Sequence, residues 1–223
     1  MQKDSKVRIG AFNIKQFGVK KLNDQFVMKT IIKILKRYDI VLCQEVHLDK
    51  KMIKQLVTLL SKSSSVPYSC LLSQLTGKER YLYLYNSNKW EVLENYLIKN
   101  KKFDRKFFRV PYVARFQNLK NPHIRITLVG CHTHPNSAYK EIKALVDDVY
   151  VDIKARLEKR DSFSVLINLL YCFGSSCISS NDDEPIVIMG DFNASGSYLK
   201  KDEQNKLDKI LYKNGLMWGI DHL

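Results

Sequence analysis

The sequence predicts a fold of the α+β or mixed α/β class, in which helices pack against the faces of β-sheets. Strand patterns outnumber helix patterns along the 223 residues. Most of the strand patterns precede the longest helix and follow one another directly, which favours sheets faced by helices. No internal repeat or interdomain linker is visible, so we expect residues 1–223 to form a single domain.

The first part of the chain alternates between strands and amphipathic helices. The strands are apolar or alternate with a period of two, and each helix places its apolar residues on one face. Asn23 or Asp24 precedes the first helix and can cap its N-terminus. The expected elements are a strand at 6–14, a helix at 23–38, a strand at 39–45 and a helix at 50–62.

The second part of the chain is rich in strands and then in helix. A long amphipathic helix is expected at 138–159, and a last strand and helix at 185–193 and 201–215. Five strand patterns lie between the helix at 50–62 and this long helix, at 68–73, 80–86, 90–96, 111–117 and 124–133. Residues 161–183 are apolar and then rich in serine, and they fit neither pattern. A connection of this length is uncommon in a compact domain, so we treat it as an atypical insertion.

The charge of the chain favours a polyanionic partner. Lys and Arg number 37 against 23 Asp and Glu, which gives a formal net charge of +14. Nucleic acid is the first candidate and an anionic membrane surface the second, while a lysine-rich composition without function is the plain alternative. The segment "KNKKFDRKFFR", at 99–109, interleaves basic and aromatic residues, which suits phosphate contact and also suits a solvated loop.

The cysteine content and the length of the apolar runs indicate the cellular compartment of the protein. No apolar run is long enough to cross a bilayer, and the charged N-terminus passes straight into a strand without a secretory signal. Five cysteines form no metal-like CxxC pair, and an odd count argues against a complete disulfide framework. Cys172 and Cys177 could pair, but nothing requires it. We expect a monomer in the nucleus or cytoplasm, or a secreted protein if the true N-terminus is missing.

Several strands end in polar residues that can do chemistry together. They are Asn13, Glu45, His132 and the pair Asp191 and Asn193 in "GDFN". Each could be an ordinary turn or cap residue. Together they form a set of oxygen donors with one imidazole. Mg²⁺ prefers carboxylate oxygens beside a phosphate, and an imidazole titrates near neutrality. A basic protein around such a set has the residue types of a metal-dependent phosphodiesterase.

The order of five motifs identifies a family resemblance. The motifs "IGAFNI", "YDIVLCQEV", "KERYLYLY", "GCHTHP" and "IVIMGDFNASGSY" resemble the deoxyribonuclease I family of the endonuclease/exonuclease/phosphatase superfamily. The resemblance runs from about residue 6 to about 220, apart from 161–183. It implies a four-layer sandwich of two central β-sheets flanked by helices. It also implies an endonuclease that requires Mg²⁺ and Ca²⁺ and cuts duplex DNA.

The resemblance implies a role for each matching residue. Asn13 and Glu45 match metal-site residues, and Asp191 and Asn193 match residues that bind the metal and the scissile phosphate. Glu79, in "KER", matches the carboxylate that orients the catalytic histidine.

That histidine is His132, a general acid or base. Arg109 matches an arginine that contacts phosphate, and Lys15 replaces an arginine at another DNA-binding position. His134 matches no catalytic position and is read as a loop residue.

The sequence also departs from the family pattern at its end, before "KER" and after "GDFN", besides Lys15 and the segment 161–183. The family continues beyond "GDFN" with a strand carrying Asp-Arg and a final Ser-Asp-His motif, whereas this sequence stops at "MWGIDHL". We therefore expect the last strands to be missing and read Asp221 and His222 as a chance ending. The loop before "KER" is short, with Gly77 where an aromatic residue is usual. Gly196 replaces a structural cysteine.

Three functions remain open on the sequence. The first is a metal-dependent endonuclease acting in DNA catabolism, with activity that loss of the C-terminal motif could impair. The second is a catalytically dead remnant that still binds DNA. The third is a superfamily relative acting on abasic DNA or a phosphoinositide, against which "KERYLYLY" and "HTHP" count.

Overall fold

The structure is a computed structural model that describes residues 7–98, 106–159, 184–194 and 198–218. The atypical insertion at 161–183, the two cysteines within it and the Asp221–His222 pair lie outside the described residues. Within the described ranges, no helix is both long and apolar enough to cross a membrane.

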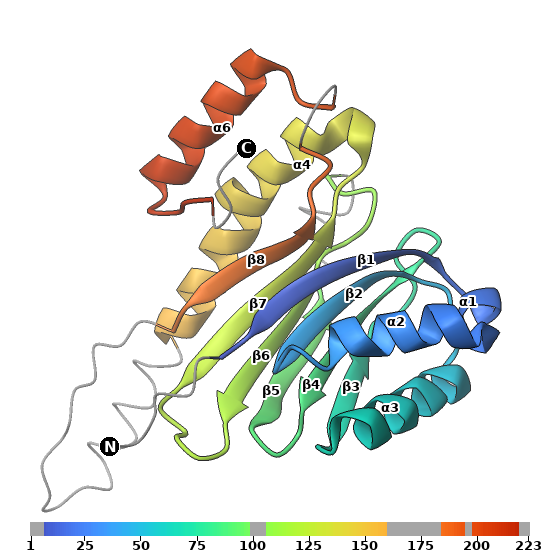
Figure 1. The fold of residues 1–223 in the computed structure, drawn as a ribbon. Coiled ribbons are helices and arrows are strands. Elements are labelled where there is room, and N and C mark those ends of the chain that lie inside the picture. Colours follow the sequence, from blue (N-terminus) through green and yellow to red (C-terminus); the bar gives the residue numbers. More distant parts are fainter. Residues whose placement is uncertain (1–6, 99–105, 160–183, 195–197, 219–223) are drawn as a thin grey trace, which may run out of the picture.

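Two four-stranded mixed sheets form the centre of the molecule (Figure 1). In each, one pair of strands is parallel and the other pairs are antiparallel. The first sheet has the order β1 (Ile9–Phe17), β2 (Ile40–Val46), β4 (Arg80–Asn86), β3 (Tyr68–Leu72). The second has the order β5 (Trp90–Leu97), β6 (Tyr112–Asn118), β7 (Arg125–His132), β8 (Ile186–Asp191).

Helices cover the outer face of each sheet, which gives four layers (Figure 1). The short α1 (Val19–Asn23), α2 (Gln25–Leu35) and α3 (Lys50–Ser64) lie on the first sheet. The second sheet is covered by a helix that starts as α4 (Ala138–Ala144) and continues to residue 159, and α6 (Lys201–Lys213) packs on α4. The predicted fold class and the four-layer sandwich are therefore confirmed.

The helices follow the predicted pattern with local differences at their ends and within the long helix. Asp24 is the cap of α2, because its carboxylate accepts hydrogen bonds from the N–H groups of Phe26 and Val27. The preceding residues form α1, a separate short helix that the pattern did not predict. The long helix is interrupted by a π-helical turn, η2 (Leu145–Tyr150), and a 3-10 turn, η1 (Pro135–Ser137), precedes α4.

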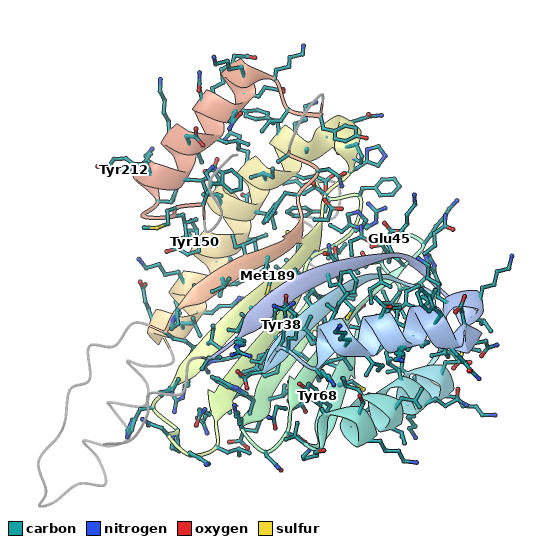
Figure 2. The ribbon with its side chains drawn as sticks, in the orientation of Figure 1. Tyr38, Glu45, Tyr68, Tyr150, Met189 and Tyr212 are labelled. Carbon is teal, nitrogen blue, oxygen red and sulfur yellow. The ribbon has the colours of Figure 1, made fainter. Side chains whose placement is uncertain are left out.

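Three apolar layers hold the sandwich together. Helices α2 and α3 pack on the outer face of the first sheet, the two sheets pack on each other, and the long helix packs on the second sheet. Strand β2 is buried on both faces, which explains why its sequence is a continuous apolar run rather than an alternating one. Met189 of β8 is a member of the inter-sheet layer (Figure 2).

Candidate active site

The predicted site residues come from both sheets and meet at one end of the sandwich. The parallel pair β1 and β2 carries Asn13 and Glu45, and the parallel pair β7 and β8 ends in His132 and Asp191. His132 and Asp191 are partners in the strand register. Parallel strands bring their carboxyl ends to the same edge, so each pair delivers its polar residues together. Figure 2 shows Glu45 at this end of the sheets.

An amide joins the two carboxylates of the site. Asn13 Nδ2 donates to Glu45 Oε1 at 2.8 Å and to Asp191 Oδ2 at 3.1 Å. Glu45 Oε2 accepts from the backbone N–H of Gln16 at 2.8 Å, and Asn13 Oδ1 accepts from the backbone N–H of Lys15 at 2.9 Å. The bond from Asn13 to Asp191 crosses from the first sheet to the second, so it links the two sheets at the site.

The backbone under this cluster is in an unfavourable conformation. Lys15, Gln16, Glu45 and Asn193 have φ angles of 34°, 52°, 57° and 44°, in the left-handed region that suits glycine. The pairing register shifts in β1 after Asn13 and in β2 before Val46, so β-bulges flank the site. Such irregularities turn side chains out of the regular pleat, and here they face Asn13 and Glu45 toward the second sheet.

A second cluster lies around His132, which is buried. His132 Nδ1 is 2.7 Å from Glu79 Oε1, and Arg109 Nε is 2.8 Å from Glu79 Oε2. The arginine contact is an ion pair in which the N–H does not point at the oxygen. Arg109 also donates from a terminal nitrogen to the His132 backbone oxygen at 3.5 Å. One carboxylate therefore holds both an imidazole and a guanidinium.

Backbone contacts join the two clusters into one site. Asn193 Nδ2 donates to the Thr133 backbone oxygen at 2.9 Å, and Asp191 Oδ1 accepts from the Asn193 backbone N–H at 3.0 Å. The N–H of Thr133 donates to the Asp191 backbone oxygen at 3.1 Å. Strands β7 and β8 therefore stay paired past their last regular residues, which keeps His132 and Asp191 side by side.

The environment of Glu45 favours its ionised form. Partial burial alone would raise the pKa of the Glu45 carboxyl. Hydrogen bonds from Asn13 and from the N–H of Gln16 oppose this, as do the electrostatic interactions with His132 and Arg109, and the pKa is lowered overall. Glu45 is therefore a carboxylate at neutral pH and lies within electrostatic reach of the His132 cluster.

The two carboxylates of the site form a set of oxygen donors that suits a divalent cation. Glu45 Oε1 and Asp191 Oδ2 accept from a single nitrogen, so two acidic oxygens converge on one point. Within the described ranges no three His, Cys, Asp or Glu side chains gather as a complete protein cage. Mg²⁺ is usually held by one or two carboxylates and completes its octahedron with water and phosphate. The donor set fits that kind of ion.

The structure brings together all eight residues that the sequence singled out. Lys15 contributes through its backbone, while its side chain is exposed. Sequence reasoning missed Gln44, a buried amide that donates to the Cys131 backbone oxygen at 2.7 Å across the sheets. It also missed that His134 lies against Phe108, with ring centroids 4.7 Å apart. Neither contact has a signal in the sequence, because both depend on how distant segments pack.

Comparison with known proteins assigns the chain to a family, although no family model matches it. Deoxyribonuclease-1 of Gallus gallus is 34% identical over 205 residues, which cover 88% of this chain and 64% of that protein. Deoxyribonuclease-1-like 1 of Rattus norvegicus is 33% identical over 217 residues, covering 96% and 60%. Deoxyribonuclease-1 of Bos taurus is 29% identical over 223 residues, covering 96% and 70%.

The chain belongs to the deoxyribonuclease I family. It spans 60–70% of the length of these three relatives. The predicted family is therefore confirmed, and it lies within the endonuclease/exonuclease/phosphatase superfamily.

Solved structures support the fold of this deoxyribonuclease I family member. A crystal structure of D. rerio TDP2 complexed with single strand DNA product has a TM-score of 0.53 at 14% identity, covering 92% of this chain and 65% of that one. The human Nocturnin catalytic domain with bound sulfate anion also has a TM-score of 0.53, at 11% identity, covering 92% and 70%. At these identities the likeness concerns the fold alone.

Proposed function

We propose that this deoxyribonuclease I family member is an endonuclease that hydrolyses phosphodiester bonds in DNA with the help of divalent metal ions. The observation that carries the proposal is the buried 2.7 Å contact between His132 Nδ1 and Glu79 Oε1 beside the two carboxylates joined by Asn13. An imidazole held by a carboxylate and placed next to a cation site is an arrangement suited to activating water for attack on phosphate.

The proposed role of His132 takes its Nδ1 as the donor to the Glu79 carboxylate. A ring nitrogen that donates to Glu79 leaves Nε2 as the acceptor, which can take a proton from water. Glu79 fixes the ring and stabilises the imidazolium that forms. The Glu79 carboxylate also pairs with Arg109, which leaves other guanidinium N–H groups for a phosphate oxygen.

Glu45 and Asp191 would hold the divalent ion, and Asn13 and Asn193 would complete its surroundings. Mg²⁺ and Ca²⁺ are the ions that the family implies. Bound there, the ion would supply charge stabilisation to the phosphate oxygens. The basic surface of the chain, with Lys15 at the site, would hold the DNA backbone.

The first prediction concerns nicking of supercoiled plasmid in Mg²⁺ and Ca²⁺. The full chain converts the plasmid to the open circular form, and His132→Ala lowers the rate about 10²- to 10⁴-fold, which is the range for losing a general base. His123→Ala, on an exposed turn, is the matched control and leaves the rate unchanged.

Two results would contradict the proposal in different ways. Unchanged nicking by His132→Ala would remove this histidine from the mechanism. Salt-sensitive DNA binding by the wild-type chain, with no cleavage at any metal concentration, would favour the alternative of a DNA-binding protein without catalysis.

A further inference from the structure

An aromatic pair that the mechanism does not use lies directly beside the site. Phe108 precedes Arg109, and His134 follows His132 by two residues. Their ring centroids are 4.7 Å apart at an interplanar angle of 48°, and the Arg109 guanidinium lies 5.2 Å from the Phe108 centroid. The pair therefore adjoins the Glu79–His132–Arg109 cluster, Phe108 through Arg109 and His134 through the chain after His132.

The Phe108 side chain is open to solvent although two groups lie against it. Its exposed fraction is 56%, so much of the side chain is accessible to a ligand. Gly77 passes next to it with φ of 61°, and a Cβ there would lie 3.6 Å from the Phe108 backbone oxygen and 3.9 Å from the ring. A glycine at this point leaves the phenylalanine ring uncovered.

The His134 ring is held in place before any ligand arrives. His134 Nδ1 accepts from the Asn136 backbone N–H at 3.2 Å, and the His134 backbone N–H donates to Glu141 Oε1 at 3.2 Å. Glu141 is buried, with an exposed fraction of 2%. A ring fixed in this way loses little conformational entropy when another ring stacks on it.

A cavity of about 680 Å³ has Phe108 and the start of the long helix among its walls. Two of its three acids are paired with lysines, since Asp148 accepts from Lys106 Nζ at 2.6 Å and Asp147 pairs with Lys143. The third, the buried Glu141, accepts hydrogen bonds from the His134 backbone N–H and the Ser137 hydroxyl. Lys140, exposed in the same wall, has no ion pair among the described residues and is available to a phosphate.

We infer that Phe108 and His134 form a stacking platform for an unpaired base next to the scissile phosphate, with Lys140 contacting the backbone of that strand. The inference rests on the proposed function for the position of the scissile bond. Aromatic side chains bind unpaired bases of any sequence, because every base has a π-face, whereas paired bases in a duplex are stacked on their neighbours. The platform would therefore favour single-stranded or locally unpaired DNA at the site over fully paired duplex.

Binding in EDTA separates this inference from catalysis. The probes are a short fluorescein-labelled oligothymidylate and a duplex of the same length, followed by fluorescence anisotropy. Phe108→Ala and Phe108→Leu weaken the affinity for the single strand about 5- to 100-fold, the range for losing one stacked base, and leave duplex affinity unchanged. Phe108→Trp keeps the π-face and retains the affinity.

Two further variants sharpen the result. Lys140→Ala weakens single-strand binding and reduces the slope of log K against log salt by about one. Tyr212→Ala, an aromatic residue of α6 with an exposed fraction of 87%, is the matched control and changes neither affinity. Equal losses on both probes, or no loss with Phe108→Leu, would overturn the inference. Absence of plasmid nicking with the expected binding pattern would instead refute only the proposed nuclease activity.

Discussion

At the scale of single residues, backbone strain is concentrated at the candidate site. Among the described residues, five other than glycine have a clearly positive φ, and all except Ser65 lie at the site. Each such conformation costs about 1–2 kcal/mol for a residue with a Cβ. Ser65 simply ends α3, where a left-handed residue is common. At the site, the strain accompanies the bulges that place Asn13 and Glu45 opposite Asp191.

A second prediction, also at this scale, is that divalent ions stabilise the folded chain through the two carboxylates. A free ion concentration of about ten times the Kd adds about 1.4 kcal/mol to the free energy of unfolding, because the ion binds only the folded state. Mg²⁺ or Ca²⁺ should therefore raise the Tm of the wild type, measured by calorimetry against EDTA. Glu45→Gln should abolish most of this increase, whereas Glu91→Gln, on the exposed side of β5, should keep it. Equal increases in both variants would place the ion elsewhere.

The sequence predicts the residues of the site better than it predicts how they are held. Asn13, Glu45, His132 and Asp191 could be selected because acids, amides and imidazoles at strand ends are unusual in number, and the family motifs assign them roles. The bond from Asn13 to Asp191 joins residues 178 positions apart, and no pattern along the chain specifies it. The bulges and the Phe108 platform depend likewise on pairing and packing between distant segments.

At the scale of elements, the approach of β8 to β7 depends on one glycine. Gly190 has φ of 143°, and a Cβ at this position would lie 1.9 Å from the Cys131 backbone oxygen. No side chain can occupy that space, because the obstacle is backbone of the neighbouring strand. This explains the "GD" of "GDFN". The glycine allows β8 to approach β7 closely, and the next residue, Asp191, therefore lies beside His132.

The third prediction is that Gly190→Ala destabilises the chain by more than about 3 kcal/mol, since it adds a backbone clash to a conformation that only glycine adopts readily. Gly215→Ala is a matched control, because Gly215 also has a positive φ, 69°, but nothing lies within 4 Å of the added Cβ. We expect it to cost only about 1–2 kcal/mol. Urea unfolding of the two variants measures the difference. Similar losses would show that φ rather than the β7–β8 contact dominates.

At the scale of the whole molecule, the sandwich could be predicted because its signals are repeated. Strand and helix periodicities recur along the chain, and the order of the motifs implied two sheets with helices outside. The sheet order was not readable, since it places β4 between β2 and β3 although β3 comes first in sequence. Nor did periodicity reveal the π-helical turn at Leu145–Tyr150, whose residues continue the apolar stripe of the helix.

The net charge of +14 is the whole-molecule property that bears on DNA, and it leads to a last prediction. Each phosphate that the protein neutralises releases counterions and contributes about −0.9 to the slope of log K against log salt on duplex DNA. With three or more such contacts, the slope is about −3 or steeper, measured by anisotropy in EDTA with His132→Ala so that no cleavage intervenes.

Substitution of single lysines then shows which face of the molecule binds the DNA. Lys15→Ala, at the site, should make the slope less steep by about one. Lys206→Ala should leave it unchanged, because this lysine lies on α6 and already pairs with Asp202 at 3.3 Å. A slope near zero in the wild type would mean that the charge is a feature of composition and not of DNA binding. A steep slope insensitive to Lys15→Ala would place the DNA on another face, away from the Glu45–Asp191 cluster.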